Sequence, residues 1–172
     1  MDQTTRALLK DALPNFQDAL AEEWLAPYVS ELGVPQSSGR WLNILAGRSL
    51  DFWRNVSWSL ERIDLIILIQ SKLTSACNRA LTEMEMAYFD GITNPYSKQI
   101  PDGRERTSRA LTYLQTHHVF PSPPAFLCHP NGMVEIVDGN HRMLAFILAM
   151  KLHPPAAKPI QDVWLGRPPD LL

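Results

Sequence analysis

The stretch EIVDGNHRMLAF at residues 135–146 constrains the fold more than any other part of the chain. A run of β-forming residues ends at Asp138, and Gly139 permits the positive φ that a sharp turn requires. The run 143–150 that follows is apolar almost all round, which predicts a helix over 140–151 buried against a sheet. The chain is therefore expected to contain a strand–turn–helix unit.

The first turn of this expected helix carries polar residues. A helix N-terminus offers free N–H groups and a partial positive charge to an anion, and His141 and Arg142 add donors there. Arg142 has the wrong sign for the helix dipole, so its position favours a compensating anion. The alternative is a helix capped by Asp138 or Asn140, whose charged first turn lies in water. The sequence leaves both interpretations open.

The composition is that of a soluble globular protein, and 172 residues suffice for one compact domain with a helical extension. Two cysteines are too few for a disulfide framework and favour a reducing cytoplasm. The first 16 residues contain acids and no long apolar run, so no signal peptide is expected. The most apolar window, 63–69, is too short to span a membrane.

The net charge of −2 argues against a protein that coats nucleic acid through bulk electrostatics. Residues 1–93 hold 8 Lys/Arg and 12 Asp/Glu, whereas residues 94–172 hold 8 Lys/Arg and 6 Asp/Glu. A polyanion site is therefore expected in the second half, where Arg104, Arg106 and Arg109 form a basic cluster. Arg106 and Arg109 share a helical face by i, i+3 spacing. They could meet phosphates or a DNA backbone, or form a solvated face.

Hydrophobic periodicity predicts an α+β fold, with a helical N-terminal extension over 1–56 and a domain over 57–172; the alternative start of the domain's core is near residue 88. In the extension, a helix over 4–32 is expected to break at Pro14 and Pro27. The other expected elements are a helical segment over 41–56, a strand over 57–65 feeding a helix over 66–88, a helix over 105–119, a hairpin over 125–139 with its turn at Asn131-Gly132, and a strand over 160–164.

The sequence also predicts where the side chains of the second hairpin strand and the aromatic residues of the extension lie. On the second hairpin strand, Val134 and Ile136 share one face, opposite Met133, Glu135 and Val137. The aromatic residues of the extension are expected in its core; the alternative is an exposed contact surface for a partner, made of Trp41, Phe52, Trp53 and Trp58. The five histidines lack the paired spacing of a zinc site, and no Walker A loop or nucleophile elbow is present.

The segment from NPYSKQ at 94–99 through VDGNHRMLAF at 137–146 resembles the ParB/sulfiredoxin (ParB/Srx) superfamily. Its ParB branch has a similar loop motif, then a helix, a hairpin and a phosphate-binding box that opens a helix. Sulfiredoxins have a cysteine in the box where this chain has Asn140, which argues against sulfinic-acid reduction. The resemblance implies a small mixed sheet with helices and binding of a nucleoside triphosphate. Some members hydrolyse ATP or CTP, some transfer phosphoryl groups and some cleave DNA.

Within this superfamily, a small protein with a helical extension is most similar to the Osa-type fertility-inhibition proteins of conjugative plasmids. Only about 20 residues follow the helix, so the DNA-binding domain of ParB is not expected. The resemblance implies an ATPase and DNase that blocks conjugative, type IV secretion-dependent DNA transfer. Its cofactors would be ATP and Mg²⁺. Its partners would be the transferred DNA, single-stranded or duplex, and a type IV coupling protein or relaxase complex.

The resemblance also implies roles for individual residues. The nucleotide phosphates would be held by Gly139, Asn140, His141 and Arg142, with Tyr96 and Lys98 beside the triphosphate. Independently of the resemblance, Glu135 and Asp138 lie just before the turn, close along the strand to the expected phosphates. One of them could hold a hydrated Mg²⁺, and the other could position the attacking water. The catalytic set would be Glu135, Asp138, His141 and Arg142. The alternative for Glu135 is an ordinary solvent-facing strand residue.

Two other function classes stay open. One is a small-molecule phosphotransferase on the same scaffold, which would need a substrate pocket instead of a basic groove. The other is a non-catalytic module that binds a nucleotide or a secretion-system protein through its aromatic N-terminal half.

Overall fold

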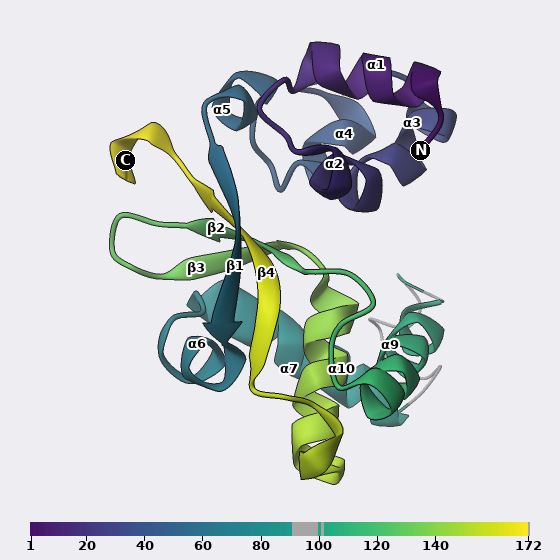
Figure 1. Cartoon of the computed structure of the whole chain (residues 1–172), viewed down its shortest axis with the longest axis vertical. Helices are drawn as coiled ribbons and strands as arrows, with labels where there is room; N and C mark the ends of the chain where they lie inside the picture. The colour runs from purple at the N-terminus through teal and green to yellow at the C-terminus, as the bar shows by residue number, and fades with distance from the viewer. Residues whose placement is uncertain (91–99, 101, 172) are drawn as a thin grey trace.

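The chain adopts an α+β fold in a computed structural model that describes residues 1–90, 100 and 102–171. Helices make up the N-terminal third, and strands begin at Ser57 (Figure 1). The helices are α1 Gln3–Ala12, α2 Asp18–Trp24, α3 Ala26–Leu32, α4 Gly39–Ile44, α5 Leu50–Arg54, α6 Leu65–Ser71, α7 Ser75–Asp90, α9 Gly103–His117 and α10 Asn140–Leu152, with short 3₁₀ turns at Pro154–Ala156 and Pro169–Leu171. The strands are β1 Ser57–Asp64, β2 Ala125–Cys128, β3 Val134–Asp138 and β4 Ile160–Arg167.

The four strands form one mixed sheet in the order β1-β4-β2-β3. β1 pairs with β4 and β2 pairs with β3 in antiparallel fashion, while β2 and β4 run parallel. The outer edge of β3 is partly covered, because Val134 exchanges backbone hydrogen bonds with Lys72 and Thr74, at 2.7 and 3.0 Å.

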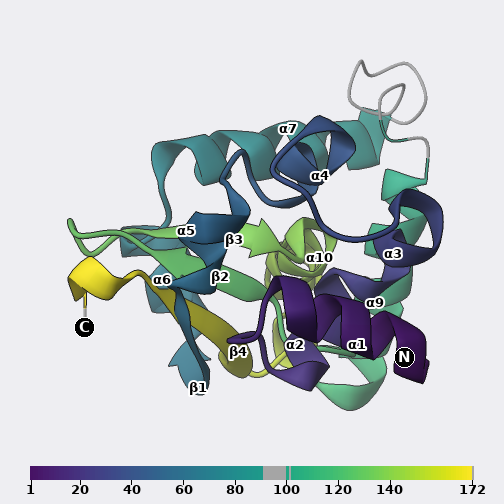
Figure 2. The ribbon, with the colours of Figure 1, turned by 90° about the horizontal axis from the view of Figure 1, so that it is seen from above.

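Helices cover both faces of the sheet, which gives a three-layer arrangement (Figure 1). One face packs against α6, α7, α9 and α10 around a core that includes Phe126, Phe146 and Leu165. The other face packs against α1–α5 around a second core to which β2 contributes Ala125 and Leu127. Seen from above, α10 is visible between α2 and α4 (Figure 2).

The aromatic residues of the extension form the centre of this second core. Trp53 is fully buried, stacks on Trp58 with centroids 6.0 Å apart, and meets Trp24 edge-on at 5.3 Å. Trp41 is also buried, and Phe52 packs against the same core. The core prediction is therefore confirmed, and the exposed contact surface proposed for Trp41, Phe52, Trp53 and Trp58 is wrong, because packing against the sheet buries the three tryptophans and leaves Phe52 only partly exposed.

The predicted hairpin, strand and long helix are present. β2 and β3 pair around a turn in which Gly132 has φ +75°, and α10 ends one residue later than predicted. Val134 and Ile136 enter the core beneath α10, whereas Val137 packs against the core of the extension. The predicted alternation of side chains between the two faces of this strand is confirmed. Successive side chains therefore point into the two different cores on either side of the sheet.

Three predicted helical segments are divided. The segment 4–32 becomes α1, α2 and α3; Pro14 lies between α1 and α2, and Pro27 is at the start of α3, as expected. A turn with positive φ at Ala46 and Gly47 separates α4 from α5. The continuous helix predicted over 66–88 is wrong, because the chain leaves the helix at Lys72 to bond to the edge of β3. None of the helices within the described ranges is long and apolar enough to cross a membrane.

Candidate functional site

The turn from β3 into α10 is built on Gly139, which has φ +95° and precedes the first helical residue. A Cβ atom at this position would lie 2.8 Å from Cβ of Pro124 and 2.9 Å from Nε of Arg142, so only glycine fits. Among the described residues, no side chain caps α10. The predicted cap by Asp138 or Asn140 is wrong, because the Asp138 carboxylate bonds to Arg142 instead.

Arg142 is held in a fixed orientation beside the helix N-terminus. Its Nη2 atom donates to Asp138, and its Nη1 atom donates to the hydroxyl of Ser122. The side chain is only 15% exposed. Asp138 therefore supplies a local anion for an arginine at the positive end of a helix. A guanidinium has five N–H donors, so further donors remain for a ligand.

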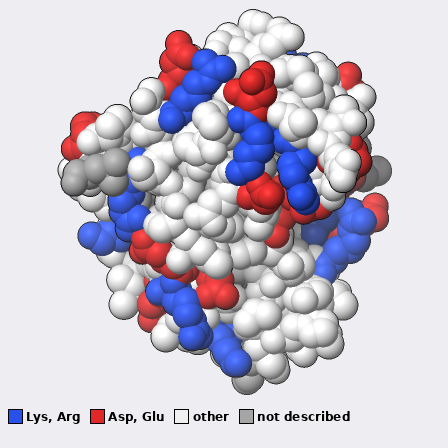
Figure 3. All heavy atoms as spheres, turned by 45° about the horizontal axis from the view of Figure 1, so that its top comes forward, with Lys and Arg blue, Asp and Glu red and all other residues white. Residues whose placement is uncertain are grey.

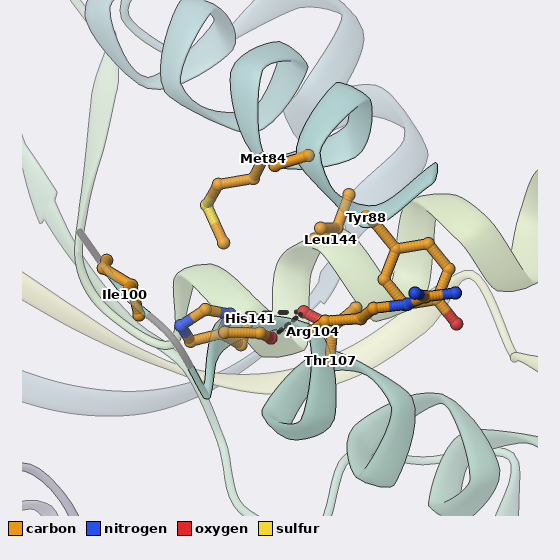
Figure 4. A pocket seen from close by; sticks show the side chains of 9 residues that line it. Met84, Tyr88, Ile100, Arg104, Thr107, His141 and Leu144 are labelled. Atoms are coloured by element: carbon orange, nitrogen blue, oxygen red, sulfur yellow. Dashed lines mark hydrogen bonds between the residues drawn. The ribbon is translucent and has the colours of Figure 1, made fainter. Parts of the chain in front are cut away.

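His141 is a neutral side chain with a defined tautomer. Its Nδ1 atom lies 3.2 Å from Oγ1 of Thr107, and that hydroxyl donates to the carbonyl of Gly103 at 3.0 Å (Figure 4). Because the threonine proton is used in this way, Nδ1 carries the imidazole proton and Nε2 keeps its lone pair. Burial lowers the pKa of His141 to about 4, and the charges of Arg106 and Arg142 act in the same direction. The ring thus presents an acceptor nitrogen and not a second cation.

Lowering the pH should destabilise the protein through His141. The unfolded chain binds a proton at this residue near pH 6.5, whereas the folded protein resists it until about pH 4. The stability contributed by the neutral imidazole is therefore complete above pH 6.5 and is lost as the pH falls toward 4. At about 1.4 kcal/mol per pKa unit, the loss is about 3 kcal/mol. Urea unfolding at several pH values should show this loss in wild type but not in His141→Gln. Parallel pH curves would contradict it.

A cleft of about 1040 Å³ opens at the start of α10. It is lined by side chains of α2, α3 and α4 on one side, by α9 on another, and by residues 137–142. Its basic groups are Arg106, Arg109 and Arg142, and its acidic groups are Glu23, Glu31 and Asp138. The lining therefore has equal numbers of arginines and carboxylates. Residues 139–142, which are expected from the sequence to hold phosphates, line this cleft.

The three arginines of α9 take different places. Arg106 and Arg109 both line the cleft, each beside an acid one turn earlier, Asp102 at 2.7 Å and Glu105 at 3.8 Å. The shared face predicted for this pair is confirmed. Arg104 does not line the cleft and lies over the ring of Tyr88, 5.7 Å from its centroid, beside a smaller pocket (Figure 4).

The two acids predicted to share a metal and water role have different surroundings. Asp138 lines the cleft, whereas Glu135 faces the extension and binds Arg48 through both carboxylate oxygens, at 2.6 and 3.3 Å. Nε2 of His129 lies 3.2 Å from the same carboxylate. Glu135 thus ties β3 to the extension. In the described ranges, no cluster of three or more His, Cys, Asp or Glu side chains is placed to hold a metal ion.

Glu23 is a residue of the cleft that the sequence did not reveal. It lies on α2 in the extension, and its Oε2 atom is buried without a hydrogen-bond partner among the described residues. Burial raises the pKa of this carboxyl, Arg142 lowers it, and Asp138 and Glu22 raise it further. No local motif marks Glu23, because only the packing of α2 over the sheet brings it to the cleft.

The remaining predicted residues, Tyr96 and Lys98, and with them the NPYSKQ motif, lie outside the described residues. Comparison with protein-family models, with curated proteins and with solved structures finds no match to the chain. The resemblance to the ParB/sulfiredoxin superfamily therefore rests on the sequence motifs at residues 94–99 and 137–146.

Proposed function

We propose that the cleft binds a nucleoside triphosphate, with its phosphates at the start of α10, and that the protein hydrolyses ATP and cleaves DNA as a ParB/sulfiredoxin-like inhibitor of conjugative DNA transfer. One observation carries the proposal. Arg142 is fixed at the N-terminus of a buried 13-residue helix, and both face a cavity large enough for a nucleotide.

The phosphate-binding part of the proposal follows from the donors in the cleft. The first N–H groups of α10 have no side-chain cap, and Arg142 retains donors beyond its bonds to Asp138 and Ser122. Arg106 and Arg109 approach the same cavity from α9. Planar guanidinium groups and a helix N-terminus are the groups that proteins use for phosphate.

The residues present also fit a magnesium ion. Mg²⁺ in nucleotide sites takes one or two carboxylates, phosphate oxygens and several waters. Asp138 offers a carboxylate in the cleft, and its Oδ1 atom has no hydrogen-bond partner among the described residues. When bound, the ion would neutralise charge on the phosphate groups.

The proposed contact with DNA would involve the arginines of α9. Arg106 and Arg109 are half-exposed or more, with 49% and 69% of their side chains accessible, so they can reach a backbone outside the cleft. On the face shown in Figure 3, however, Lys and Arg lie next to Asp and Glu instead of gathering in one basic patch. A short contact near the cleft fits this distribution better than a long bound duplex.

The same charge balance favours a second candidate, a small-molecule phosphotransferase. Helices of the extension line one side of the cleft, and its three arginines are matched by three carboxylates. Such a pocket suits a nucleotide together with a small polar acceptor.

The two candidates differ in what consumes ATP. The full chain should be incubated with Mg²⁺ and ATP, alone, with single-stranded DNA, with duplex DNA, and with a panel of small alcohols and amino acids. Phosphate release together with shortened DNA supports the nuclease. ATP consumption that requires a small acceptor supports the phosphotransferase. No consumption and no nucleotide binding under any condition would overturn both.

A further inference from the structure

The cleft contains a carboxylate, that of Glu23, to which the proposed function gives no role. Glu23 belongs to α2, in the helical extension, yet it lines the same cavity as Asn140, His141 and Arg142. The part of the chain that resembles the ParB/sulfiredoxin superfamily does not include α2. The extension therefore contributes an acidic group to the cavity where the phosphates are proposed to bind.

Glu23 differs from the other acids in and around the cleft in lacking a partner. Asp138 bonds to Arg142, Glu31 to Arg40, and Glu22 to the N-terminal amine of Met1. Oε2 of Glu23 is buried with no hydrogen bond among the described residues. A buried carboxylate oxygen without a hydrogen bond costs stability, so the presence of Oε2 of Glu23 in this cavity points to a role in binding or chemistry.

Partial burial makes the Glu23 carboxylate a better proton acceptor than its neighbours in the cleft. Burial raises the pKa of its carboxyl, with Arg142 acting against this shift and Asp138 and Glu22 adding to it. Asp138 is a weaker candidate because its carboxylate is engaged by Arg142. His141 is a weaker base because its pKa is lowered to about 4.

We propose that Glu23 is a catalytic residue that accepts the proton of the attacking water, an inference that rests on the proposed nucleotide hydrolysis. The water oxygen forms a bond to the terminal phosphorus, and its proton passes to the Glu23 carboxylate. The bond between that phosphorus and the bridging oxygen breaks, and its electron pair stays on the nucleoside diphosphate. Inorganic phosphate leaves, and Glu23 returns its proton to solvent.

This role makes the helical extension part of the enzyme. Phosphoryl transfer depends mainly on positioning and charge stabilisation, and here the phosphate-holding groups come from α10 and the proton acceptor from α2. The two helices belong to different layers and are fixed relative to each other by the sheet between the two cores.

The test compares Glu23→Gln with the matched control Asp18→Asn, which removes a charge from the exposed side of the same helix, where Asp18 pairs with Lys10 at 2.9 Å. In Glu23→Gln, kcat for ATP hydrolysis should fall by about 100-fold or more, the usual range for a lost general base. The Kd for Mg-ATP, measured by calorimetry, should change by less than about threefold. The Tm should not fall, because the amide removes an unpaired buried charge. Asp18→Asn should hydrolyse ATP at the wild-type rate.

The outcomes separate this inference from the proposed function. Wild-type protein that neither binds nor hydrolyses ATP would overturn the proposed function and leave Glu23 without a reaction. Hydrolysis by wild type and by Glu23→Gln at equal rates would overturn the role of Glu23 alone. A lower Tm with lost binding in Glu23→Gln, accompanied by full activity in Glu23→Asp, would show a structural role and would also overturn the inference.

Discussion

Replacing Arg142 with alanine should reduce ATP hydrolysis by about 100-fold or more, a loss as large as the one expected for Glu23→Gln. The change removes the charged donors that face the cavity beside the N-terminus of α10. It also leaves Asp138 without its partner, so a repulsive charge faces the phosphates. Charge-assisted hydrogen bonds of this kind contribute about 2–3 kcal/mol, and each 1.4 kcal/mol is a factor of ten. Phosphate release at saturating Mg²⁺ measures the effect.

Two further variants serve as controls for Arg142→Ala. Arg142→Lys keeps the positive charge but loses the planar fork, so its activity should lie between wild type and Arg142→Ala. Arg62→Ala removes an exposed arginine from β1, outside the cleft lining, and should hydrolyse ATP normally. Wild-type turnover by Arg142→Ala would show that the phosphates do not bind at this helix.

Gly139→Ala should cause the largest loss of stability among single small substitutions at the site. The residue has φ +95°, which costs an L-residue about 1–2 kcal/mol. The added Cβ would also lie 2.8 Å from Cβ of Pro124, and relieving such an overlap costs about 1–3 kcal/mol. The sum of about 2–5 kcal/mol should lower the Tm by roughly 4–20 °C for a chain of this size. Thermal unfolding followed by circular dichroism measures it.

Gly47→Ala separates the two causes. Gly47 has φ +75°, similar to that of Gly139, but a Cβ there would meet nothing within 4 Å. It should therefore show only the backbone cost, about 1–2 kcal/mol. Equal losses of stability in the two variants would mean that the close approach of Pro124 to the turn is not a constraint.

The strand–turn–helix unit could be predicted because its signals are local. A β-forming run, a glycine and an apolar helix each depend on neighbours in the chain, so the hairpin and the bounds of α10 followed from the sequence. The break at Lys72 could not be predicted in this way. Residues 66–88 have good helical periodicity, and the helix ends at Lys72 only because a distant strand offers Val134 as a hydrogen-bond partner.

The site shows the same division between local and distant effects. Spacing along α9 placed Arg106 and Arg109 on one face, and both line the cleft. Glu135 was expected near the phosphates from its distance along the strand, yet Arg48 of the extension binds it. No sequence pattern marks Glu23, since its place depends on how the extension packs over the sheet. Spacing along one helix predicts which residues that helix brings together, whereas residues brought together by tertiary packing leave no such pattern.

The central claim is that the cleft at the start of α10 holds the phosphates of a nucleotide. Its most direct test is calorimetric titration of the full chain with Mg-ATP and Mg-CTP, with adenosine as the phosphate-free comparison. A saturable one-to-one heat for at least one triphosphate is expected, together with no heat for adenosine and at least tenfold weaker binding in Arg142→Ala. Absence of heat with both triphosphates, or equal binding by wild type and Arg142→Ala, would contradict the claim.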